Sequence, residues 1–484
     1  MQQKSVTKNY IYNLTYQILI LILPLVTTPY ISRILGAQNI GIFSFTTSIS
    51  AYFILFGSLG IALYGQREIA YVQNNKQEYS KTFFEIVLLR ILTIFISLIF
   101  FYFVFVIGNN DYKIYYKILV LEIVGNCLDI SWFFQGLEEF KKTVIRNIFV
   151  RIISVLCIFT FVKHEGDLVI YFIIYTLSGI LGNCTLWLYL PKYLTKINIK
   201  RLEIFKHLKP TIMLFIPQIA IQVYTLLDRT MLGFLESNIS EVGYYEQSQK
   251  IIKILLAVIT SMGTVMLPRI SNNFANGEKE SINEYIKKSF NIVFLLAFPM
   301  IFGIIAISQR FVPVFFGDGF EKVGLIMKVI SPIILIIGMS NVVGMQYLLP
   351  TKRQKEFTIS VICGAIINFV LNIILIMQFK SIGASIATVI AEITVVIVQI
   401  YFIRKEFDIK NIIKISKNYL ISSIIMFIIC TIVINFIYSN VISILIGVIT
   451  GVITYLICLL FLKDRFIIEI INKIKNVVIK LKGR

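Results

Sequence analysis

Amide, hydroxyl and guanidinium side chains recur inside long apolar runs of this chain, at spacings that align them on one face of a helix. The two clearest sets are Gln218, Gln222, Thr225 and Arg229, and Asn147, Arg151 and Ser154. Their intervals of four, seven and eleven residues place side chains in one stripe along a helix. Guanidinium and amide N–H groups donate hydrogen bonds to phosphate oxygens. These stripes therefore predict a polar cavity that binds an anionic ligand.

Arginines at four positions inside or at the ends of apolar runs support this prediction. A charge near the centre of a bilayer costs at least about 2.5–3.5 kcal/mol, so it usually faces protein or water. Neither Arg90 nor Arg151 has an acidic residue at a helical pairing distance in the sequence; Glu85 precedes Arg90 by five residues. We therefore expect Arg33, Arg90, Arg151 and Arg229 to line a water-filled cavity. The alternatives are hydrogen bonding between helices and, for Arg33 and Arg229, interaction with outer headgroups.

Acidic side chains also lie inside apolar runs. Glu122 and Asp129 flank Asn126 at intervals of four and three residues, and Glu392 follows Ser385 and Thr388 in a similar stripe that Gln399 continues. We predict Glu122, Asp129 and Glu392 as candidates for coupling to protons or sodium. The six cysteines lack CxxC spacing and the two histidines fall in different loops, so we expect no metal, cofactor or disulfide.

The composition indicates that membrane helices hold these side chains. Of 484 residues, 57% are hydrophobic and only 15% are charged, and the mean hydropathy is +0.83. Soluble proteins are typically about a quarter charged. Apolar runs of about twenty residues, each able to cross a hydrocarbon core of roughly 30 Å, recur along the chain. We expect an all-α polytopic membrane protein with fourteen transmembrane helices at residues 11–32, 40–64, 83–107, 114–134, 144–162, 168–190, 211–234, 251–268, 289–308, 325–349, 358–377, 381–403, 418–437 and 441–462.

The basic residues predict the orientation of these helices. The net charge is +20, and lysines and arginines concentrate in alternate loops and at both ends, most densely in residues 191–210. The positive-inside rule therefore places both termini in the cytoplasm. The basic residues form no recognition motif, so we expect no nucleic-acid partner.

An internal repeat predicts two lobes. "RILG" (33–36) follows Pro24 in the first span and "RTMLG" (229–233) follows Pro217 in the seventh, and each is followed by a Gly-Ile-Phe or Gly-Tyr-Tyr string. Six spans separate the copies, so both run in the same direction, as in parallel transporter repeats. We expect two six-helix lobes related by a pseudo-twofold axis, with the glycines permitting a tight reversal after each arginine.

The repeat also gives the expected domain boundaries. They are an N-lobe at 1–190, a basic cytoplasmic linker at 191–210, a C-lobe at 211–403, two accessory spans at 404–462 and a basic amphipathic cytoplasmic tail at 463–484. We expect the tail to bind anionic lipids of the inner leaflet. In the last span, "GVITG" (447–451) is a GxxxG motif that predicts packing against the preceding span.

Four strings resemble a known family: "TPYISRILGAQNIGIFSF" (28–45), "DISWFFQGLEEFKK" (129–142), "LDRTMLG" (227–233) and "MLPRIS" (266–271). They are similar to O-antigen and capsule-type polysaccharide flippases of the multidrug/oligosaccharidyl-lipid/polysaccharide exporter superfamily. The resemblance implies a protein of the bacterial cytoplasmic membrane that is not an enzyme. It would move an undecaprenyl-diphosphate-linked oligosaccharide from the inner to the outer leaflet by alternating access, alongside polysaccharide polymerase and assembly machinery. The resemblance also implies a cationic lumen.

Two other functions remain as alternatives. A drug/cation antiporter of the same superfamily shares the fold, but a cavity rich in arginine disfavours cationic substrates. A membrane polysaccharide polymerase or ligase would act on the same lipid-linked sugars, but such chemistry usually needs a large outer loop, and the predicted outer loops are short.

Overall fold

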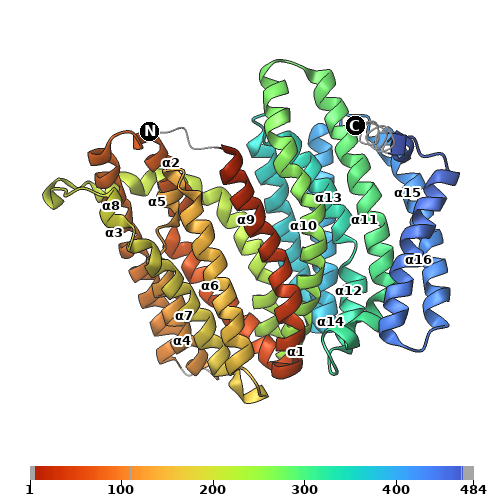
Figure 1. Cartoon of the computed structure of the whole chain (residues 1–484), viewed down its shortest axis with the longest axis horizontal. Coiled ribbons are helices and arrows are strands. Elements are labelled where there is room, and N and C mark those ends of the chain that lie inside the picture. The colour runs from red at the N-terminus through yellow and green to blue at the C-terminus, as the bar shows by residue number, and fades with distance from the viewer. Residues whose placement is uncertain (1–5, 109–110, 470, 473–484) are drawn as a thin grey trace, which may run out of the picture. The chain divides into compact units, whose positions relative to one another are not determined.

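The computed structural model describes residues 6–108, 111–469 and 471–472, and the chain packs into two compact units that divide between Gly243 and Tyr244. Both units consist of helices, and the described residues contain no strand (Figure 1). The all-α fold is therefore confirmed. The predicted C-lobe begins at residue 211, whereas this division places residues 211–243, and with them the seventh predicted span, in the first unit. The predicted domain boundaries remain predictions.

The first unit is built on long helices that run side by side. α4 and α6 both pack against α7, and α1 packs against α3, α4 and α6 (Figure 1). The α-helices of this unit are α1 (Val6–Ser58), α2 (Ile61–Val72), α3 (Lys76–Phe101), α4 (Lys113–Cys127), α5 (Ser131–Gly136), α6 (Phe140–Phe161), α7 (Leu168–Trp187), α8 (Leu190–Tyr193) and α9 (Leu208–Leu235). A π-helical segment, η1 (Tyr102–Ile107), follows α3, and three short 3₁₀ turns are η2 (Glu165–Asp167), η3 (Ile199–Arg201) and η4 (Ile204–His207).

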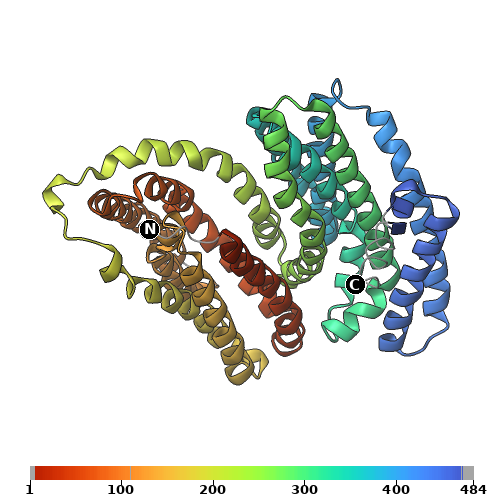
Figure 2. The same ribbon diagram turned by 45° about the horizontal axis from the view of Figure 1, so that its top comes forward.

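The second unit follows from within α10. Its helices are α10 (Ser240–Ala275), α11 (Lys279–Phe315), α12 (Glu321–Ile330), α13 (Ile333–Ser340), the π-helical η5 (Asn341–Leu348), α14 (Gln354–Ile403), α15 (Ile409–Asn435) and α16 (Asn440–Phe461). The helices α15 and α16, blue in Figure 2, lie side by side and pack on α11. Added Cβ atoms on Gly447 and Gly451 would approach Ile434 and Cys430 of α15 to 2.9 and 3.0 Å, which confirms the predicted packing role of the GxxxG motif.

Eleven helices of the described residues are long and apolar enough to cross a membrane. Two of them contain a break: α1 at Gly36, where φ is +72°, and α14 at Lys380, where φ is +56°. Each of these helices therefore contains two predicted spans. The helix α9 coincides with the predicted span 211–234 but is not among the eleven. The chain is a multi-pass membrane protein, and the count of fourteen spans stays a prediction.

Two predicted spans are interrupted where the sequence suggested continuity. The run 114–134 breaks after α4 ends at Cys127, because the Asp129 carboxylate accepts hydrogen bonds from the Ser131 N–H (3.0 Å) and hydroxyl (2.5 Å) where α5 begins. The run 40–64 breaks at Leu59 and Gly60, which both have positive φ. Asp129 therefore does not continue a helical stripe from Glu122, and that part of the prediction is wrong.

The glycines have different structural roles in the two copies of the repeat. Gly36 lies at the break in α1, as predicted. Gly233 lies inside α9, where an added Cβ atom would come within 2.0 Å of the Phe45 ring, so this glycine permits close packing and the prediction of a reversal there is wrong. Gly41 also permits close packing, because its added Cβ atom would lie 2.0 Å from the carbonyl oxygen of Ile239.

Candidate functional site

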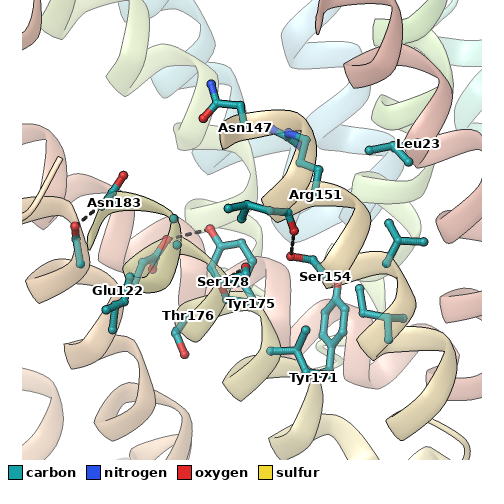
Figure 3. Close-up of a pocket in the computed structure, with 18 of the residues that line it drawn as sticks. Leu23, Glu122, Asn147, Arg151, Ser154, Tyr171, Tyr175, Thr176, Ser178 and Asn183 are labelled. Carbon is teal, nitrogen blue, oxygen red and sulfur yellow. Dashed lines mark hydrogen bonds between the residues drawn. The ribbon is translucent and has the colours of Figure 1, made fainter. Parts of the chain in front are cut away.

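A cavity of about 450 Å³ lies inside the first unit, between α1, α4, α6 and α7 (Figure 3). All four helices belong to segments long and apolar enough to span a membrane, α4 together with α5 as the segment Lys113–Gly136. The cavity wall is nevertheless polar over much of its area, with residues from three helices contributing carboxylate, amide, hydroxyl and guanidinium groups. A polar cavity between such helices is a functional-site candidate, because polar groups inside a membrane are costly unless water or a ligand meets them.

The helix α6 supplies the cationic wall. Asn147, Arg151 and Ser154 all line the cavity, so the predicted stripe faces one space (Figure 3). Ser154 uses its hydroxyl to donate to the Val150 carbonyl of its own helix at 2.8 Å. Val155 and Ile158 extend the same face with apolar side chains. The helical period of 3.6 residues per turn was therefore sufficient to predict that these three side chains share one face of α6.

Sequence reasoning missed a second arginine on this helix. Arg146 also lines the cavity, and its Nη1 donates to Asn183 Oδ1 of α7 at 2.7 Å. The Asn183 amide in turn donates to the Gly125 carbonyl of α4 at 2.8 Å, so the three helices are joined at this point. Arg146 directly precedes Asn147, and this proximity to the stripe is the only feature of the sequence that could have predicted its place in the cavity.

The helices α4 and α7 supply the opposite wall. The Glu122 carboxylate accepts hydrogen bonds from the Ser50 hydroxyl at 2.6 Å and from the Tyr175 hydroxyl at 2.7 Å. Tyr171 and Tyr175, four residues apart on α7, both line the cavity, and the Phe43 ring packs against them with centroid distances of 4.7 and 5.2 Å. Sequence reasoning missed these tyrosines because aromatic residues on an apolar helix are typical of ordinary packing.

Arg90 has an acidic partner, contrary to the sequence prediction. It is only 3% exposed, and its Nη2 lies 4.0 Å from the Asp129 carboxylate, which comes from the α4–α5 break. Its Nε and Nη2 also donate to the carbonyl and side-chain oxygens of Asn126 at 3.1 and 2.8 Å. Arg90 therefore binds the C-terminal end of α4 behind the cavity wall, where a cation also complements the helix dipole. It is not among the residues that line the cavity.

The remaining predicted site residues lie elsewhere. Arg33 is exposed on α1 outside the cavity lining, and Glu392 is buried in α14 of the second unit. On α9, Gln222 and Thr225 are exposed, Arg229 is partly buried, and the side chain of Gln218 lies outside the described part. Of the predicted set, the structure brings Glu122, Asn147 and Arg151 together in this cavity.

Some of the other polar residues form hydrogen bonds inside the protein, and the bond between Thr388 and Tyr245 joins two helices, as the alternative interpretation expected. Thr388 of α14 lies 3.1 Å from the Tyr245 hydroxyl, and the Gln399 amide donates to Ser360 at 3.3 Å. The Asn372 amide donates to Asn368 at 3.0 Å within the same helix. These hydrogen bonds lie inside the second unit.

Comparisons with known proteins place the chain in a family. The model of the family described as "Polysaccharide biosynthesis protein" matches residues 6–274, and the MatE model matches residues 214–374. The putative O-antigen transporter of Escherichia coli (strain K12) is 28% identical over 406 residues, which cover 83% of this chain and 97% of that protein. The lipid II flippase MurJ of Bacillus subtilis (strain 168) is 25% identical over 183 residues, which cover 37% of this chain and 34% of that protein.

The fold agrees with these sequence matches. A solved structure of lipid II flippase MurJ in an inward closed conformation aligns with a TM-score of 0.73 at 18% identity, covering 94% of this chain and 100% of that chain. The resemblance seen in the four sequence strings is therefore confirmed. The chain belongs to the polysaccharide biosynthesis protein family, within the multidrug/oligosaccharidyl-lipid/polysaccharide exporter superfamily.

Proposed function

We propose that this protein is a flippase that moves an undecaprenyl-diphosphate-linked oligosaccharide from the inner to the outer leaflet of the bacterial cytoplasmic membrane by alternating access. Family membership supports this function, as do relatives named as an O-antigen transporter and a lipid II flippase. These relatives are transporters, which supports the expectation that the chain is not an enzyme.

The observation that carries the proposal is the polar cavity with two arginines, Arg146 and Arg151, between membrane-spanning helices. Sugar hydroxyls and a diphosphate cannot enter hydrocarbon without losing their hydrogen bonds to water, whereas the lipid tail can remain in the bilayer. A cavity of this kind replaces those hydrogen bonds during transfer. Guanidinium groups are suited to this because they bind phosphate oxygens through two parallel hydrogen bonds.

The membrane potential favours the proposed direction. With the cell interior negative, outward movement of one net negative charge releases about 2.3 kcal/mol per 100 mV. A diphosphate-linked cargo carries a net negative charge, so the membrane potential favours its outward movement. A drug/cation antiporter is less suited to the cavity, because a cationic drug would meet the guanidinium groups of Arg146 and Arg151.

Substitutions at Arg151 test the proposed function. Arg151→Ala should abolish export of surface polysaccharide at near-normal protein levels, Arg151→Lys should retain part of it, and Arg151→Glu should be inactive. Lysine keeps the positive charge and therefore part of the export activity, but it lacks the guanidinium geometry that binds phosphate through two hydrogen bonds, so its activity should stay below that of wild type. The measurement is surface polysaccharide per unit of membrane-inserted protein, in cells that depend on this gene for export.

A matched control is Arg201→Ala, because Arg201 is exposed in the linker and outside the cavity. This variant should export normally. An Arg151→Ala protein that exports normally at normal abundance would remove Arg151 from the site and contradict the proposed role of the cavity. If Ala instead lowers the amount of folded protein and Lys is no intermediate, Arg151 serves only to hold helices together.

A further inference from the structure

The break between α4 and α5 is held by a buried arginine that keeps an unused donor. Arg90 of α3 is 3% exposed, and its Nε and Nη2 donate to the backbone and side-chain oxygens of Asn126 at 3.1 and 2.8 Å. Its Nη1 is buried and meets no hydrogen-bond acceptor among the residues that the structure describes. An unsatisfied buried donor is costly, so a further contact to Nη1 would stabilise the protein.

A carboxylate lies close to this arginine but forms its hydrogen bonds elsewhere. Asp129 Oδ1 accepts from the N–H and the hydroxyl of Ser131, at 3.0 and 2.5 Å, where α5 begins. Asp129 Oδ2 lies 4.0 Å from Arg90 Nη2, which is too long for a hydrogen bond. Residues 128–130 lie outside both α-helices, so no α-helix fixes the backbone dihedral angles that place this carboxylate.

The carboxylate therefore has two competing sets of contacts. In the set that the structure shows, Asp129 accepts two hydrogen bonds from Ser131 and thereby caps α5. In the other set, it would leave Ser131 and accept two parallel hydrogen bonds from Nη1 and Nη2 of Arg90. Paired charges in this bidentate geometry form strong hydrogen bonds. Both sets give the carboxylate two hydrogen bonds, so exchange between them does not leave it without partners.

The end of α4 connects this exchange to the cavity. Gly125 and Asn126 both line the cavity, and Arg90 binds the oxygens of Asn126. The Gly125 carbonyl accepts from the Asn183 amide, and the Asn183 oxygen accepts from Arg146 of the cavity wall. A movement of the Arg90 guanidinium towards the carboxylate would therefore change the position of a helix end that forms part of this wall.

The second unit contains a related irregularity at the equivalent place of the repeat. Both α5 and η5 end in the same turn, in which one N–H donates four residues back, the N–H two positions later donates five residues back, and the residue between them has positive φ. The turn residues are Phe133, Phe134, Leu137, Glu138 and Glu139 in the first unit, and Tyr347, Leu348, Thr351, Lys352 and Arg353 in the second. The segment before the turn is broken in the first unit and π-helical in the second. Such π-helical segments are frequent at functional sites, so this part of each repeat is a candidate hinge.

We propose that Arg90, Asp129 and Ser131 form a two-state switch within the first unit. In one state Asp129 caps α5, and in the other it pairs with Arg90 and opens the α4–α5 break, which changes the cavity wall at Gly125 and Asn126. Packed elements with two discrete arrangements are a common basis of such transitions. Arg90 is thus a positioning residue that acts through α4. The inference goes beyond the proposed function, because it applies to any ligand that enters the cavity.

Hydrogen–deuterium exchange of the purified full-length protein in nanodiscs tests this switch, because the capped state protects the Ser131 amide. The measurement is the exchange rate of peptides that cover residues 126–134, by mass spectrometry. Asp129→Asn keeps an oxygen that caps α5 but removes the charge that pairs with Arg90, so exchange should slow about threefold. Ser131→Ala removes one of the two hydrogen bonds that hold Asp129 at α5, so exchange should speed up about fivefold.

The opposite signs distinguish a switch from a cap that is only structural. Loss of a purely structural cap would speed exchange in both variants, because each of them weakens it. Arg90→Gln removes the pairing charge from the other side and should slow exchange as Asp129→Asn does. Glu78→Gln, at an exposed position of α3, is the control and should change nothing. Thermal unfolding of each variant shows that it is folded.

Two results would overturn the switch. Faster exchange in Asp129→Asn would show that the carboxylate only caps α5. Unchanged exchange in both Asp129→Asn and Ser131→Ala would show that the break does not open through this contact. The proposed flippase function is tested separately, by export in the Arg151 variants, so either proposal can fail while the other stands.

Discussion

Substituting alanine for Glu85 should destabilise the first unit far more than the substitution of a surface residue would. The Glu85 carboxylate on α3 is fully buried, and it binds the end of the linker through the Glu203 N–H at 2.8 Å and the Lys206 ammonium at 2.9 Å. His207, itself 3% exposed, donates from Nε2 to the same carboxylate at 2.9 Å, and its Nδ1 forms a hydrogen bond with the Tyr64 hydroxyl at 2.7 Å. The Glu85 side chain therefore holds residues 203–207, the segment that leads into α9, in place.

The size of the effect follows from what alanine leaves behind. The Glu203 N–H and the His207 N–H would lose their acceptor, and each unsatisfied buried donor costs about 1–3 kcal/mol. The Lys206 side chain is 42% exposed, so the loss of its ion pair adds at most about 1 kcal/mol. We therefore expect Glu85→Ala to lower the free energy of unfolding by about 2–6 kcal/mol, mainly through the two unsatisfied donors.

Lys81→Ala is the matched control. Lys81 lies 3.6 Å from the same carboxylate but its side chain is 39% exposed, so its loss should cost at most about 1 kcal/mol. Urea unfolding of the purified protein in detergent gives the two free energies, and trypsin cleavage after Arg201 reports release of the linker. Glu85→Ala should accelerate that cleavage and Lys81→Ala should not. If Glu85→Ala unfolds within about 1 kcal/mol of wild type, the buried cluster does not hold the linker and the reasoning fails.

Two further predictions concern packing and topology. Gly41→Val should lower the amount of folded protein, because even its Cβ atom would lie 2.0 Å from the Ile239 carbonyl oxygen. The control Gly303→Ala should be tolerated, because its Cβ atom would meet no atom within 4 Å. Equal yields of the two variants in membrane preparations would contradict this prediction. Tags after Arg484 and in residues 191–210 should report the cytoplasm and a tag in residues 163–167 the outside, measured by paired reporter fusions, and a cytoplasmic result for the last would refute the predicted orientation.

The sequence was sufficient to predict the membrane class, most helical runs and one face of the site. Asn147, Arg151 and Ser154 belong to one helix, so their common direction depends only on helical geometry, and the structure places all three on the cavity. Helix breaks were harder to predict. The break at Gly36 carries a glycine, but the break after Cys127 depends on an Asp129 side chain that bonds to the next turn, inside an apolar run that looked continuous.

Contacts between helices could not be predicted from spacing along one helix. Arg90 lacked an acidic residue at helical spacing, yet Asp129, thirty-nine positions later in the sequence, lies 4.0 Å from it. Residues that ended up elsewhere, such as Gln222 and Thr225 on α9, follow the same periodic rule as the cavity residues. Periodicity identifies a face of a helix, but the neighbouring helices determine what that face meets.

Glu122 shows how this limit bears on function. Its position in an apolar run marks it as costly, and a costly carboxylate admits several explanations: an ion pair, a coupling site or a ligand contact. The structure narrows these, because the groups that meet it are the hydroxyls of Ser50 and Tyr175 and the space of the cavity. The carboxylate accepts one hydrogen bond at each oxygen from these hydroxyls, which hold it in a fixed orientation on the cavity wall. Arg146 and Arg151 of α6 line the same cavity, so Glu122 belongs to the site that we propose for the anionic cargo and is not part of a separate structural ion pair.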